Sequence, residues 1–89
     1  MMELIKQKDA ISTLQRVLIE KIDEDPLAVS ILNDIQESIS EEIAEGNTRI
    51  DYRVTSVCSD TNLRYIRDLI STLGYQVILS ERSFIINLF

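Results

Sequence analysis

The fold is decided by the stretch TRIDYRVTSVCSDTNLRYIRDLISTLGYQVILSERSFIINLF, residues 48–89, in which the hydrophobic pattern changes its period. Apolar and polar residues alternate over 48–57, apolar residues recur at helical spacing over 60–73, and two short apolar runs follow over 75–80 and 84–89. Alternation is typical of a strand with one wet face, and the i, i+3, i+4 spacing is typical of an amphipathic helix. The stretch therefore predicts a strand, a helix and two further strands, in that order.

Upstream of this stretch, residues 3–22 and 26–45 each carry an apolar stripe at helical spacing. Asp25 is placed to cap the second helix through its carboxylate, with Pro26 at the first helical position and Gly46 ending the helix. The short connection between the two helices predicts that they are antiparallel neighbours.

Together these elements predict a single α+β domain over residues 1–89, in which an antiparallel helical hairpin precedes a βαββ unit with a small three-stranded mixed sheet. A right-handed crossover and a short last hairpin favour the split order, with the last strand between the other two and antiparallel to both. A second arrangement stays open, in which the first two strands are parallel neighbours and the last strand lies at an edge. The expected core is Leu14, Leu18, Ile31, Ile35, Ile39, Ile50, Tyr52, Leu63, Ile66, Leu69, Val77, Ile86 and Leu88.

The last hairpin is apolar on both faces. One face can be covered by the second and third helices, whereas the other carries Ile78, Ile85 and Phe89. That other face needs either the first helix folded across it or a second copy of the chain. The short connection ties the first helix to the same side as the second, which favours the second copy and a two-fold dimer. We therefore expect Ile78, Ile85 and Phe89 to form an interaction surface.

The charge is distributed unevenly along the chain. Its net charge is −6, and residues 1–45 hold eleven acidic and four basic side chains, against four acidic and five basic side chains in residues 46–89. An acidic half repels nucleic acid, so we expect no nucleic-acid partner. The sequence has no apolar run of membrane-spanning length and no signal peptide, and its single cysteine suits a reducing compartment, so we expect a cytoplasmic protein without a membrane partner.

Three acidic residues, Glu41, Glu42 and Glu45, crowd the last turn of the second helix. Acidic side chains there oppose the helix dipole. They are either a solvated cluster that Arg49 or Arg53 compensates, or part of an interaction surface.

Residues that could carry chemistry are few. The chain has no histidine, one cysteine and no glycine-rich phosphate loop, so we expect no metal, no cofactor and no catalytic residue. Cys58 and Arg64 are spaced as in the phosphate loop of cysteine-dependent phosphatases and arsenate reductases, which this segment resembles, but the loop lacks glycine and Asp60 would repel a dianion. We predict instead that Cys58 is structural and packs on Leu63 over the start of the third helix. Arginine is scattered in the sequence and predicts no basic cluster.

The second half also resembles a group of natural proteins. A helix ending in Leu73-Gly74-Tyr75-Gln76-Val77, and the terminal run 84–89, resemble small accessory proteins encoded by tailed bacteriophages. The resemblance implies no functional residues. Three hypotheses on function result: a self-associating, non-enzymatic protein-binding or structural accessory protein whose partner is unknown, an acidic decoy that inhibits a nucleic-acid-binding host protein, and a small Cys-x5-Arg phosphatase.

Overall fold

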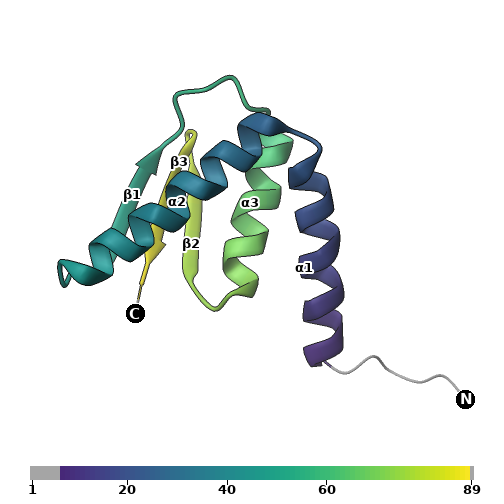
Figure 1. The fold of residues 1–89 in the computed structure, drawn as a ribbon, viewed down its shortest axis with the longest axis horizontal. Coiled ribbons are helices and arrows are strands. Elements are labelled where there is room, and N and C mark those ends of the chain that lie inside the picture. Colours follow the sequence, from purple (N-terminus) through teal and green to yellow (C-terminus); the bar gives the residue numbers. More distant parts are fainter. Residues whose placement is uncertain (1–6, 89) are drawn as a thin grey trace, which may run out of the picture.

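The computed structural model describes residues 7–88, which form three helices and three strands (Figure 1). Their order and bounds are α1 Gln7–Asp23, α2 Pro26–Ala44, β1 Arg49–Arg53, α3 Asp60–Thr72, β2 Gln76–Ser80 and β3 Ser83–Asn87. The predicted α+β class and the predicted order of elements are confirmed. The expected start of the first helix at residue 3 and the contacts of Phe89 lie outside the described residues.

The sheet has the order β1-β3-β2, so the predicted split arrangement is confirmed and the parallel alternative is wrong. Both pairings are antiparallel, and the sheet is therefore not mixed in its hydrogen bonding. Ile85 at the middle of β3 lies between Asp51 of β1 and Ile78 of β2.

The helices lie to one side of the sheet. In Figure 1, α2 crosses in front of β1 and β3, α3 stands beside β2, and α1 lies on the far side of α3 from the strands. The sequence predicts that α1 and α2 are antiparallel neighbours, but the two helices diverge from their short connection. α1 packs mainly along α3 and less along α2. Among residues 7–88, no helix is long and apolar enough to cross a membrane.

Side chains from all six elements meet in one core between the sheet and the helices. Of the expected core residues, nine are buried, and Ile39, Tyr52 and Val77 are partly buried against them. The prediction for Leu14 is wrong, because its side chain is 45% exposed. The apolar stripe of α1 is broad, and only the side that carries Leu18 and Ile22 meets the core.

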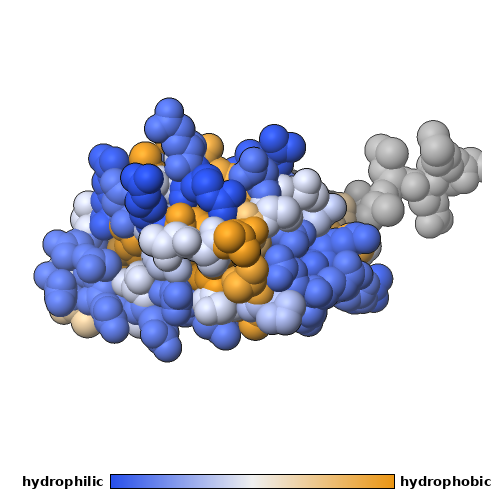
Figure 2. All heavy atoms as spheres, turned by 90° about the horizontal axis from the view of Figure 1, so that it is seen from above, coloured by the Kyte–Doolittle hydropathy of each residue, from blue (hydrophilic) through white to orange (hydrophobic). Residues whose placement is uncertain are grey.

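β1 is shorter than the predicted strand 48–57, because its partner ends. The backbone N–H of Val54 donates to the carbonyl of Arg82, in the turn where β3 begins. Beyond that bond β1 has no strand to pair with, and the chain becomes a loop in which Val57 is 90% exposed. Figure 2 shows this end of the molecule, where hydrophobic atoms lie exposed within a rim of hydrophilic side chains.

The turns have the local chemistry that the sequence predicts at the helix ends. The Asp25 carboxylate accepts from the N–H of Leu27 at 3.0 Å, and Pro26 occupies the first turn of α2. Gly46, with φ of 82°, ends that helix. The turn between β2 and β3 instead places two residues with large side chains, Glu81 and Arg82, at positive φ, as a two-residue hairpin of the I′ type requires.

Candidate binding surface

Within residues 7–88, no helix packs on the face of the sheet turned away from α2 and α3, and we call this face the bare face. Its middle row is Asp51, Ile85 and Ile78, which the register places side by side. Ile78 is 59% exposed, and Ile85 is half-buried. α1 packs on α3 and α2 instead, so it does not supply the cover that the first alternative required. Two of the three predicted surface residues are thus neighbours, and Phe89 lies outside the described residues.

The predicted acidic residues belong to a different part of the molecule. Glu41, Glu42 and Glu45 lie at the end of α2, on the helical side of the sheet. The side-chain amide of Asn47 donates to carboxylate oxygens of both Glu42 and Glu45. Within residues 7–88, neither Arg49 nor Arg53 forms a salt bridge with these glutamates. The carboxylates are therefore hydrogen-bonded by an amide and are not paired with an arginine.

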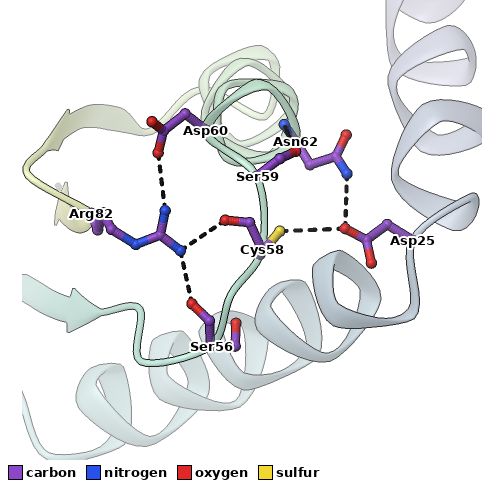
Figure 3. Close-up of polar contacts among 7 residues, drawn as sticks. All are labelled: Asp25, Ser56, Cys58, Ser59, Asp60, Asn62 and Arg82. Carbon is purple, nitrogen blue, oxygen red and sulfur yellow. Dashed lines mark hydrogen bonds and ion pairs between the residues drawn. The ribbon is translucent and has the colours of Figure 1, made fainter.

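Cys58 lies in a polar network that joins two helix starts (Figure 3). Its side chain is 2% exposed, and its thiol donates to Asp25 Oδ2 at 3.5 Å. The same oxygen accepts from the Asn62 amide at 2.8 Å, and the Asp25 pKa lies below its ordinary value mainly because of that bond. One carboxylate therefore caps α2 and also ties it to the first turn of α3.

This environment opposes a nucleophilic role for Cys58. Burial raises the pKa of its thiol, and the hydrogen bond to the Asp25 carboxylate raises that pKa further. Ser59, which caps α3, already accepts the N–H of Asn62 at 3.2 Å, so that donor is not free to hold an oxyanion. Arg64 is exposed and lines a pocket to which Cys58 does not contribute. The Cys-x5-Arg spacing is thus not accompanied by an activated thiol.

We expect Cys58 to react slowly with a thiol reagent in the native state at neutral pH. A raised folded pKa favours the protonated thiol, so its contribution to stability is present below the unfolded pKa and is lost as the pH rises through the folded value. Labelling by a disulfide reagent, followed from neutral to strongly alkaline pH, should accelerate only well above the ordinary cysteine pKa. Rapid labelling at neutral pH, before unfolding, would contradict this assignment.

Arg82 fastens the loop between β1 and α3 to the hairpin tip. Its Nη2 donates to the carbonyls of Ser56 and Cys58, both at 2.8 Å, and its Nη1 donates to Asp60 at 3.0 Å (Figure 3). The side chain of Arg82 is 37% exposed. The loop has no regular structure of its own, so this one guanidinium satisfies carbonyls that no strand or helix can reach.

Three arginines converge, contrary to the expectation from the sequence. Arg64, Arg67 and Arg82 line one pocket of about 360 Å³ beside β2. Helical spacing places Arg64 and Arg67 on one side of α3, and the hairpin brings Arg82 to it from the end of the sheet. Leu63 and Leu79 supply apolar lining, and Asp60 and Glu81 also contribute. The signal that could have found this cluster was the i, i+3 arginine pair on α3.

Within residues 7–88, no three His, Cys, Asp or Glu side chains are grouped to hold a metal ion. Comparisons with protein-family models, with curated proteins and with solved structures give no match.

Proposed function

We propose that this chain is a non-enzymatic protein-binding module that pairs with a second copy of itself through the bare face of its sheet. The observation that supports this most directly is the cross-strand pair of Ile78 and Ile85 on a sheet face that no helix within residues 7–88 covers. Isolated exposed apolar residues are common, but two adjacent isoleucines at the middle of an open sheet form a surface with a polar surround.

The charges on this face do not repel a second copy. Two such faces can be laid together about a two-fold axis parallel to β3, which places β1 of one copy over β2 of the other. Arg49 then meets the partner's Gln76, Arg53 meets the partner's Ser80, Asp51 meets the partner's Ile78, and the two Ile85 side chains meet each other. No like charges face one another. Both copies use the same surface, so the interface is complete with two copies, as two-fold symmetry requires.

The dimer should be weak. Full burial of an isoleucine side chain contributes about 1.5–3 kcal/mol, so the four isoleucines of such an interface contribute at most about 6–12 kcal/mol. Loss of translational and rotational freedom costs about 4–15 kcal/mol. The two ranges overlap, and dissociation should therefore occur at micromolar concentration or above.

We expect sedimentation to show a reversible dimer of the wild type at high micromolar concentration, and a monomer for Ile78→Glu/Ile85→Glu with an unchanged circular dichroism spectrum. Leu73→Glu is the matched control, because Leu73 is 57% exposed against 59% for Ile78 but follows α3 away from this face. It should dimerise as the wild type does. A wild type that stays monomeric, or a control that dissociates equally, would refute pairing through this face.

A further inference from the structure

β2 lies at one edge of the sheet and is incompletely covered. Among residues 7–88 it pairs only with β3. Its two helix-facing residues, Val77 and Leu79, are half-buried, whereas their cross-strand partners Ile86 and Phe84 on β3 are completely buried. An edge strand with solvent-facing backbone groups is a template for pairing with another extended chain.

The backbone groups that face the free edge can be identified. Leu88 N–H donates to Thr48, and the N–H of Val54 donates to Arg82, which fixes the alternation along β3. In an antiparallel ladder, alternate residues turn their N–H and C=O groups to opposite sides. The even-numbered residues of β3 therefore turn their N–H and C=O groups toward β1, and the odd-numbered residues turn theirs toward β2. On β2 this leaves the N–H and C=O groups of Val77 and Leu79 pointing to the free edge.

Beside this edge lies the pocket that the three arginines line. Leu63 and Leu79 give it an apolar wall. Arg67 is bonded to its neighbour Asp68, in a pair that is 38% and 46% exposed and therefore weak, and Arg64 has no partner among the side chains of residues 10–88. The pocket thus offers one guanidinium without a partner and one that exchanges its partner at little cost.

We propose that β2 and this pocket bind an extended acidic peptide segment of another protein, which adds to the sheet as a fourth strand. An extended chain suits this edge, because its backbone matches the spacing of the N–H and C=O groups of Val77 and Leu79 and can bond to all of them at once. Alternate side chains of that strand point toward α3, where acidic ones meet Arg64 and Arg67 and lay their methylene groups against the wall at Leu63 and Leu79. This site is separate from the bare face of the sheet and does not depend on dimer formation.

The two acidic residues of the pocket set the register of the incoming chain. Asp60 is neutralised by Arg82 at 3.0 Å. Glu81 lies at the hairpin tip and has no salt bridge with a side chain of residues 10–88. It should repel acidic side chains there, so the acidic positions of the peptide lie along the middle of α3 and not at the tip.

The test uses two soluble peptides of alternating sequence, acetyl-(Glu-Val)₃-amide and acetyl-(Lys-Val)₃-amide, titrated into the wild-type protein at a concentration at which sedimentation shows it to be monomeric. The acidic peptide should bind, and the basic one should not. At a peptide concentration ten times Kd, amide hydrogen exchange of Val77 and Leu79 should slow about tenfold. Exchange at residue 78, whose N–H already bonds to β3, should not change. The reading at Val77 and Leu79 distinguishes strand addition from attraction to a basic patch.

N-methylation gives a second reading of the backbone. In a strand, the N–H groups of alternate residues point to opposite edges. N-methylation of either all glutamates or all valines should therefore abolish binding, while methylation of the other set should be tolerated. Binding through charge alone would treat both peptides equally.

Charge reversal locates the acidic contacts. Arg64→Glu and Arg67→Glu should each weaken binding of the acidic peptide by at least tenfold, and together they should allow the basic peptide to bind. Arg53→Glu is the matched control at the opposite edge of the sheet, and it should leave the affinity unchanged. The proposal is overturned if the acidic peptide does not bind at millimolar concentration, if both peptides bind equally, or if Val77 and Leu79 become protected by raising the protein concentration alone, which would identify a second copy as the occupant.

Discussion

Replacing Ile35 by alanine should lower the free energy of unfolding by about 2–5 kcal/mol. Ile35 lies in the middle of α2, is completely buried and belongs to the single core of the molecule. Truncation removes three carbon atoms from a site whose neighbours come from several elements, and such a site cannot collapse to fill the cavity. Small domains have about 5–15 kcal/mol in total, so the variant should be close to unfolding at physiological temperature.

The same helix provides a control of the same residue type. Ile43 is 44% exposed near the end of α2, and Ile43→Ala should cost less than about 1 kcal/mol. Both variants can be compared with the wild type by urea denaturation, with unchanged m-values as the check that unfolding stays two-state. Leu69→Ala on α3, where Leu69 is 5% exposed, should resemble Ile35→Ala. Equal losses at Ile35 and Ile43 would mean that the buried side of α2 is assigned wrongly.

The sequence was sufficient to predict the local structure because each element carries its own signals. Asp25 and Pro26 begin α2, and Gly46 ends it, by interactions among residues a few positions apart. The alternation of apolar and polar residues over β1 predicts that Ile50 is buried. Its side chain is only 5% exposed, which confirms the prediction. The central place of β3 followed from the crossover and the short hairpin, which leave few arrangements. These features depend on neighbours in the chain and could be predicted without a tertiary model.

The buried side of helix α1 could not be predicted from the sequence. Its apolar residues cover more than one side, and the sequence does not say which side meets the core. The structure places α1 against α3, where the Gln15 amide donates to the Thr72 hydroxyl at 3.2 Å, so Leu18 is buried and Leu14 is exposed. The same docking leaves Ile78 uncovered. Both outcomes depend on the packing of helices far apart in sequence, which hydrophobic period alone does not encode.

The pocket beside β2 was missed for a similar reason. Arg64 and Arg82 are far apart in the sequence, and they meet only because the hairpin turns its tip toward the start of α3. The sequence also did not predict that Arg82 holds the loop between β1 and α3. Residues with positive φ in such turns are more often glycine or asparagine, so nothing in the sequence assigned Arg82 a structural role. An arginine kept at φ of 66° indicates that its side chain does something glycine cannot do.

Removal of that side chain should therefore be costly. We expect Arg82→Ala to lower the free energy of unfolding by about 1–3 kcal/mol. Hydrogen bonds from a charged donor contribute about 1.5–3 kcal/mol each when buried, and the 37% exposure of this side chain reduces the sum of its bonds to Ser56, Cys58 and Asp60. Arg82→Lys should recover little, because an ammonium group lacks the planar fork that reaches both carbonyls and the carboxylate at once.

Glu81→Ala is the control for the turn itself. Glu81 also has positive φ, and its side chain forms no salt bridge with a side chain of residues 10–88, so this variant keeps the backbone strain and should stay within about 0.5 kcal/mol of the wild type. The difference between the two variants, measured by urea denaturation, isolates the guanidinium. Release of the loop should also speed the labelling of Cys58 in Arg82→Ala under native conditions, because the carbonyl of Cys58 loses its donor. If Arg82→Ala costs no more than Glu81→Ala and labelling is unchanged, the loop is held by the packing of Val54 and Cys58 in the core, and the guanidinium contacts are incidental to it.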